Sequence, residues 1–316
     1  MDIVLGVADR YVFTKYQVYP DAWTEDYWLR QFLSLYVIVN VLFVISYFFA
    51  ASLCYIFVFD KRLKRHPFFL KNQIRHEIKM SLLSCIQQAV LFAAIMLLEV
   101  RGFSKLYMYE DSDTIGYTTW FLVARDVIGM VAFSDSAIYW IHRWLHHRLV
   151  YKHIHKQHHM YKITSPFASH AFHPLDGFAQ SLPYHVFPFL FPIHKYVYLV
   201  LLFLVNMWTI SVHDGDTRVP GPLKAYINGT AHHTDHHLYY NYNYGQYFTL
   251  WDRIGNSYRT PMVFQGKSPL DDLVDENCKE VDGKEEATVS KGKLHGSLGS
   301  RPVNRTKMTQ ANQITI

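Results

Sequence analysis

The stretch from Phe32 to Phe59 contains no charged side chain and is almost entirely apolar. A helix needs about 20 such residues to cross the hydrocarbon core of a bilayer, so this stretch can span it with some tilt. The whole chain is 50% hydrophobic and 16% aromatic. That composition is typical of a membrane protein with aromatic belts at the two interfaces. Residues 32–59 therefore predict a transmembrane helix around which the rest of the chain must fold.

Three further apolar segments follow, at about 81–100, 119–141 and 186–211. The segment at 119–141 is less purely apolar, because it carries Arg125, Asp126 and Asp135. The last is interrupted by Pro188, Pro192, His194 and Lys195. Such a break indicates two shorter pieces or a re-entrant hairpin. The chain is thus predicted to be all-α, an integral membrane bundle of about four transmembrane segments.

Charges in the loops predict how the chain lies in the membrane. The loop between the first two segments is strongly basic, with Lys61, Arg62, Lys64, Arg65, Lys71, Arg75 and Lys79 against two acidic residues. The positive-inside rule places this loop in the cytosol. The third segment then ends in the cytosol at His142, and a hairpin at 186–211 would keep the later residues on that side. The modest net charge of +5 is not concentrated into a nucleic-acid footprint.

Most of the 19 histidines lie between His142 and His237, in three clusters near the apolar segments. The clusters are His142–His147, His155–His159 and His232–His237. Residues at i, i+3 and i+4 share one face of a helix, so two His-x-x-His-His sequences would each point three imidazoles the same way. Histidine is costly near lipid unless it is bound to something. The three cysteines form no CxxC, so imidazole and not thiolate is the expected ligand.

This pattern predicts a cytosolic, histidine-rich helical cap that holds a di-metal site, since one ion needs only three or four protein ligands. The predicted ligands are His142, His146, His147, His155, His158, His159, His213, His232, His233, His236 and His237, with His170 and His173 as ligands or near neighbours. Asp135, seven residues before His142, is predicted to accept the second N–H of a ligand. Asp214 and Asp235 are weaker candidates for that role.

Imidazole-bound iron activates O₂, and a membrane supplies unreactive lipid or sterol C–H bonds as substrate. The chain has no GxGxxG fingerprint and no haem-attachment motif. The electrons must therefore come from a partner protein that docks on the cytosolic face, where the basic side chains would attract an acidic surface.

Longer motifs around the histidines resemble the fatty acid hydroxylase superfamily of membrane di-iron enzymes and, within it, the sterol C5-desaturases. They are Ser134–His147, Pro166–Gly177, Ser181–His185, Trp208–Asp216, Asn228–His237 and Tyr242–Arg253. The resemblance implies an enzyme of the endoplasmic reticulum that introduces the C5–C6 double bond into a Δ7-sterol. It also implies a di-iron centre, O₂, and NADH electrons delivered by cytochrome b5 and its reductase. Some members of the superfamily have four residues between the two histidines of the first cluster, a spacing that selects His147. Helix geometry favours His146, and both remain candidates.

The likeness covers about residues 1–265, which we take as the membrane domain. Residues 271–316 are rich in Lys, Glu, Ser, Gly and Asn, and predict a disordered polar tail. The nearest alternative function is a related sterol or lipid hydroxylase with the same metals. A metal transporter is a remote alternative, since its sites would lie at the membrane midplane on broken helices. A purely structural membrane protein is the third.

Overall fold

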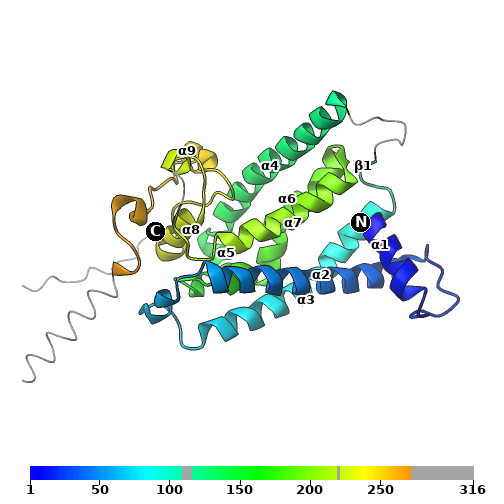
Figure 1. Ribbon diagram of the computed structural model, residues 1–316, viewed down its shortest axis with the longest axis horizontal. Coiled ribbons are helices and arrows are strands. Elements are labelled where there is room, and N and C mark those ends of the chain that lie inside the picture. Colours follow the sequence, from blue (N-terminus) through cyan, green and yellow to red (C-terminus); the bar gives the residue numbers. More distant parts are fainter. Residues whose placement is uncertain (109–115, 219–220, 272–316) are drawn as a thin grey trace, which may run out of the picture. The chain divides into compact units, whose positions relative to one another are not determined.

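A computed structural model describes residues 1–108, 116–218 and 221–271 (Figure 1). Residues Met1–Leu270 form one compact unit. The regular elements of the described part are helical except for two strands of two residues each, as the sequence predicts. Of the predicted tail, 271–316, only Asp271 lies within the described residues.

Two helices of the described chain are long and apolar enough to cross a membrane, α2 (Trp28–Phe57) and α3 (Gln73–Val100). They pack against each other along their lengths. Large apolar side chains on α2 are nonetheless exposed, including Val41, Ile45, Phe49, Ile56 and Phe57. A soluble protein rarely leaves so large an apolar surface uncovered. This surface is typical of a membrane protein, with α2 and α3 as its candidate spanning helices.

Helix α4 (Tyr117–Leu145) contains the third predicted segment and continues beyond it. Its first charges neutralise each other, because Arg125 donates to Asp126 at 2.7 Å. The other oxygen of Asp126 accepts the backbone N–H of His194 at 2.8 Å. These contacts explain how an otherwise apolar helix carries an ion pair. The last turn of α4 carries His142.

The fourth predicted segment, 186–211, is not one helix. Helix α6 (Pro174–Leu190) ends before Phe191, and α7 (Lys195–Ser211) starts after a short turn. Across that turn the His185 ring lies 3.1 Å from the Tyr198 hydroxyl, so the two helices run back on each other. The break predicted from the prolines is therefore a helical hairpin that begins well before residue 186. A count of four spans is not established by these helices.

The remaining elements are short. They are α1 (Asp2–Ala8), β1 (Leu106–Tyr107), α5 (Arg148–Tyr151), β2 (Ile193–His194), α8 (Thr230–Tyr239), α9 (Leu250–Ile254), a π-helical turn at Asp9–Phe13, and 3₁₀ turns at Lys61–Arg65, His158–Met160, Pro166–His170, Gly221–Leu223 and Met262–Gln265. Strands β1 and β2 pair in parallel, with Leu106 opposite Ile193. This pair ties the loop before α4 to the turn of the hairpin.

The long helices alternate in direction between two ends of the unit. Where α3 begins, the Gln73 side chain donates to the carbonyl of Ile163, beside the histidine-rich segments. Where α3 ends, Glu99 accepts from Tyr198 near the start of α7. Helices α2, α4 and α7 run towards the histidines, and α3 and α6 run away from them (Figure 1). The histidine-bearing segments are thereby collected at one end of the helices.

Candidate metal centre

Nine histidines converge into two groups, in each of which the candidate ligand nitrogens lie within 4.8 Å of one another. The first group comprises His142, His146, His155, His159 and His236, and the second comprises His158, His213, His233 and His237. No carboxylate or thiolate belongs to either group among the described residues. Imidazole suits iron, copper, nickel and zinc, so two all-imidazole groups are suited to hold a pair of transition-metal ions.

Each His-x-x-His-His sequence supplies both groups. In the first sequence, His155 and His159 join the first group, whereas His158 joins the second. In the other, His233 and His237 join the second group and His236 the first. The expectation that all three imidazoles of a box point one way is therefore wrong. On a helix, residues four apart differ by about 40° in direction, whereas residues three apart differ by about 60° to the opposite side.

The second cluster departs from the predicted helix as well. Residues 152–157 form turns, and His158–Met160 form a 3₁₀ turn. Helical spacing therefore explains the grouping of the histidines at the end of α4 and on α8. It does not explain the grouping of His155, His158 and His159, which lie in turns.

Contacts to backbone carbonyls fix several rings. His142 donates from Nδ1 to the Tyr244 carbonyl at 2.9 Å, and His236 donates from Nδ1 to the Tyr242 carbonyl at 2.7 Å. His213 donates in the same way to Thr209, one turn back on α7, at 2.7 Å. A carbonyl only accepts, so the proton lies on Nδ1 and the lone pair on Nε2. Each of these rings offers Nε2 to its group.

A buried carboxylate fixes a fourth ring. Asp176, in the first turn of α6, lies 2.7 Å from Nδ1 of His155, and both side chains are fully buried. The second oxygen of Asp176 accepts from Gln180 at 2.7 Å. Carboxylate–histidine pairs of this kind orient metal ligands and increase their basicity. The spacing of the sequence gives no signal for Asp176, which stands 21 residues after its partner.

Burial keeps the imidazoles neutral. It lowers the pKa of His142 to about 3 and that of His213 to about 4. Burial and the neighbouring histidines lower the pKa of His146, His158, His159, His233, His236 and His237 well below the ordinary value. Neutral imidazole is the form that binds a metal.

The ring positions themselves indicate a cation. Nε2 of His155 lies 3.2 Å from Nε2 of His142 and 3.0 Å from Nε2 of His159. In the second group, Nε2 of His233 lies 2.9 Å from that of His213 and 3.0 Å from that of His237. In their neutral forms His142 and His155 both carry the proton on Nδ1, so their two Nε2 lone pairs face each other. That arrangement is repulsive unless a cation lies between them, and the donor set therefore fits a metal pair.

Four predicted ligands lie outside both groups. His147 is exposed at the start of α5, and His232 packs against the rings of Tyr258 and Phe264. His173 accepts from the backbone of Leu175 and so caps α6. His170 contacts Ser169 and Asn206 through its two ring nitrogens. Between the alternatives in the first box, His146 joins the group and His147 does not.

The carboxylates predicted to support the ligands have other roles. Asp135 accepts the backbone N–H groups of Tyr247 and Phe248 at 2.8 and 3.2 Å, so its expected bond to a histidine is wrong. Asp135 holds the loop that carries the Tyr244 carbonyl, and thus acts on His142 only through that loop. Asp214 accepts from the backbone of Asp216, and Asp235 accepts from that of Met262. Asp176 takes the place predicted for Asp135.

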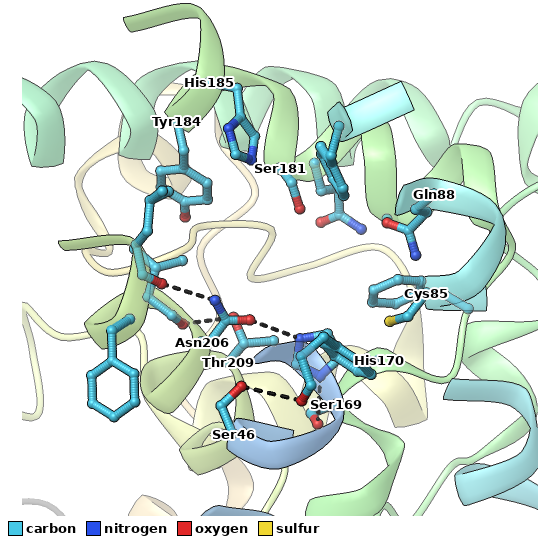
Figure 2. Close-up of a pocket in the computed structure, with 18 of the residues that line it drawn as sticks. Ser46, Cys85, Gln88, Ser169, His170, Ser181, Tyr184, His185, Asn206 and Thr209 are labelled. Carbon is cyan, nitrogen blue, oxygen red and sulfur yellow. Dashed lines mark hydrogen bonds between the residues drawn. The ribbon is translucent and has the colours of Figure 1, made fainter. Parts of the chain in front are cut away.

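A mainly apolar cavity of about 580 Å³ opens onto the histidines. Its wall includes His142, His158, His213 and His233. Away from them it is lined by side chains of α2, α3, α6 and α7, and it reaches Met1 and Val4 of the N-terminal segment. Figure 2 shows the middle of this cavity. A volume of this size suits a single lipid-like molecule.

Comparison with known proteins identifies the family. The chain is 58% identical to the lathosterol oxidase of Homo sapiens over 85% of this chain and 89% of that protein. It belongs to the sterol 5(6)-desaturase family of fatty acid hydroxylases. Lathosterol oxidase of Rattus norvegicus is 56% identical over the same shares of the two chains.

Fungal members of the sterol 5(6)-desaturase family are more distant. A Delta(7)-sterol 5(6)-desaturase of Aspergillus fumigatus is 48% identical over 80% of this chain and 71% of its own length. The family model described as fatty acid hydroxylase matches residues 127–257, and this range includes all nine histidines of the two groups. No solved structure matches the chain.

Proposed function

We propose that this chain is a Δ7-sterol 5(6)-desaturase, which converts lathosterol to 7-dehydrocholesterol during sterol biosynthesis. The observation that carries the proposal is the pair of buried, all-imidazole groups at the end of a lipid-sized apolar cavity. The identity to lathosterol oxidases over most of the chain supports the choice of substrate.

We assign the nine converging histidines as the ligands of two iron ions. Bound iron would supply the oxygen-dependent oxidation of an unactivated C–H bond. In the net reaction the sterol loses two hydrogen atoms, and O₂ takes these, two electrons and two protons to give two water molecules. The electrons would come from NADH through cytochrome b5 reductase and cytochrome b5.

The chain's own residues prepare the site. The Nδ1 contacts of His142, His213 and His236 hold the imidazoles before any ligand arrives, so little rearrangement is needed on binding. Apolar side chains of the cavity exclude water from the reacting carbon atoms and bury the steroid skeleton. Desaturation and hydroxylation share this metal scaffold, so the seating of the sterol against the histidines would decide the product.

We place the protein in the endoplasmic reticulum membrane, with α2, α3, α4 and the α6–α7 hairpin as its membrane part and the histidines facing the cytosol. The basic loop between α2 and α3 lies at the histidine end, in agreement with the positive-inside rule. Arg143, Arg148, Lys152 and Lys156 are exposed around the histidine segments. These cations would attract the acidic surface of an electron donor such as cytochrome b5.

The test uses microsomes from cells that lack their own sterol 5(6)-desaturase and express this chain. Incubation with lathosterol, NADH and O₂ should give 7-dehydrocholesterol, and a His236→Ala variant should give none. An oxygenated sterol in its place would identify a hydroxylase and refute the proposal. Iron-free purified protein with full activity, or metal transport into vesicles that needs the same histidines, would refute the assignment of the metal centre.

A further inference from the structure

One wall of the cavity is polar, although its surroundings are apolar. Ser169 and His170 end the 3₁₀ turn at Pro166–His170, and Asn206 faces them from α7 (Figure 2). The His170 ring also lies edge-on to Phe43 and Tyr47 of α2, with ring centroids 5.0 and 5.8 Å apart. These three polar residues form what we call the α7 polar wall.

In each hydrogen bond of the α7 polar wall the donor and the acceptor can be assigned. The Asn206 side-chain nitrogen donates to the Leu202 carbonyl at 2.8 Å, which orients the amide so that its oxygen faces His170. That oxygen lies 3.2 Å from Nε2 of His170, so Nε2 carries the proton and donates. Nδ1 of His170 is then an acceptor for the Ser169 hydroxyl at 3.0 Å. The proton positions follow because carbonyl and amide oxygens only accept.

One donor is left over. An amide nitrogen has two hydrogen atoms, and the second one on Asn206 makes no hydrogen bond to another described residue. Asn206 lines the cavity, so this N–H is available to whatever the cavity holds. An amide donor in an apolar cavity is costly unless the occupant accepts its hydrogen bond.

The position of Asn206 relative to the histidines suits a sterol. It lies on α7 seven residues before His213, which follows the end of that helix, or roughly 10 Å away at the rise of a helix. On the other side, the ring of His170 contacts Phe172, which in turn contacts the ring of His158. In a 3-hydroxysterol the hydroxyl is on C3, two bonds from C5. If C5 and C6 are to react at the histidine groups, the hydroxyl must lie a short distance from them.

We infer that Asn206 donates a hydrogen bond to the 3-hydroxyl of the sterol and that His170 and Ser169 hold the amide in the orientation this needs. The inference rests on the proposed function and specifies which residue holds the hydroxyl of the substrate.

The experiment compares lathosterol with its 3-deoxy analogue, which has the same ring skeleton and lacks the hydroxyl. For each enzyme, kcat/KM is measured for both compounds by the ultraviolet absorbance of the conjugated diene. The wild-type enzyme should prefer lathosterol by about tenfold or more, because a buried donor stays unpaired with the analogue. Asn206→Leu should abolish most of this preference by lowering kcat/KM for lathosterol alone.

Gln88→Leu is the matched control, because Gln88 is also an amide in the same cavity but lies on α3, on the opposite wall (Figure 2). This variant should keep the wild-type preference. A preference that survives Asn206→Leu, or that is lost in Gln88→Leu, overturns the assignment. Since the preference is a ratio within one preparation, a lower yield of folded enzyme does not change it. If Asn206→Leu does not accumulate, Asn206→Ala serves the same test, because alanine favours the helix. Failure of the proposed function gives a different result, with no diene from either compound in the wild type.

Discussion

Replacing Asp176 by asparagine tests how the imidazoles are held. The Asp176 carboxylate is fully buried, with one oxygen 2.7 Å from Nδ1 of His155 and the other accepting from Gln180. Asparagine has nearly the same volume, so packing should be preserved. The substitution removes the negative charge and replaces one acceptor by an N–H donor.

The magnitude depends on which way the new amide points. If Gln180 continues to donate to the amide oxygen, the amide nitrogen faces His155 and its proton must move from Nδ1 to Nε2. That Nε2 lies among the lone pairs of His142 and His159, so His155 would no longer serve as a ligand. If the amide oxygen instead faces His155, the hydrogen bond to Nδ1 is kept and only the negative charge is lost. Metal affinity should therefore fall by about 10- to 100-fold, or about 1.4 to 2.7 kcal/mol.

The assay is a competitive titration of the purified protein with a chelator, together with sterol turnover at saturating iron. Asp135→Asn is the matched control, because Asp135 is also a buried aspartate but bonds to the amides of Tyr247 and Phe248. Asparagine keeps the oxygen that accepts both amides, so the loop that carries Tyr244 should stay in place and the metal affinity should remain that of the wild type. An unchanged affinity in Asp176→Asn, or an equal loss in both variants, would refute the role given to the Asp176–His155 pair.

Three further outcomes are expected. His232→Ala should retain bound iron whereas His236→Ala should lose it, as elemental analysis of purified protein will show, because only His236 belongs to a group. Gly255→Ala should destabilise the fold by about 1–3 kcal/mol, measurable as an earlier thermal transition, since its Cβ would overlap the buried hydroxyl of Tyr139. Metal binding at pH 6 should release few protons in calorimetry with buffers of different ionisation enthalpy. The lowered pKa values, about 3 for His142, leave these rings neutral above about pH 5, so ordinary protonation at pH 6 would contradict the burial described here.

The sequence predicted the histidines that converge in the fold, because their signal is local. A spacing of four residues on a helix brings two imidazoles to one side, and this is how His142 in the last turn of α4 and His146, the residue that follows the helix, come together. His213 was also predicted, from its place at the end of an apolar run, and it joins the second group. Spacing alone could not decide between His146 and His147 as the second histidine of the first cluster, because the answer depends on where α4 ends. The helix ends at Leu145.

The contacts that hold the ligands were not predictable in the same way. The carbonyls of Tyr242 and Tyr244 reach the histidines only through the folding of a loop, and any residue type offers a carbonyl. Asp135 was chosen because seven residues are nearly two helical turns, but two turns also carry it roughly 10 Å along α4 from His142. At that height it meets the amides of Tyr247 and Phe248. The prediction considered the direction of the Asp135 side chain around the helix and neglected its distance from His142 along the axis.

If the proposed ions occupy the two histidine groups, the sharing of two short segments by both groups has a consequence for metal uptake. The turns at His155–His159 and His233–His237 each contribute to both groups, so neither ion can bind without ordering backbone that the other also uses. The first ion would bear the entropic cost of fixing these shared turns, and the second would bind to turns already fixed. Uptake should therefore be cooperative, with half-loaded protein scarce at every metal concentration. A cell short of iron would then contain a mixture of empty and fully loaded enzyme, and the amount of active protein would fall steeply over a narrow range of supply.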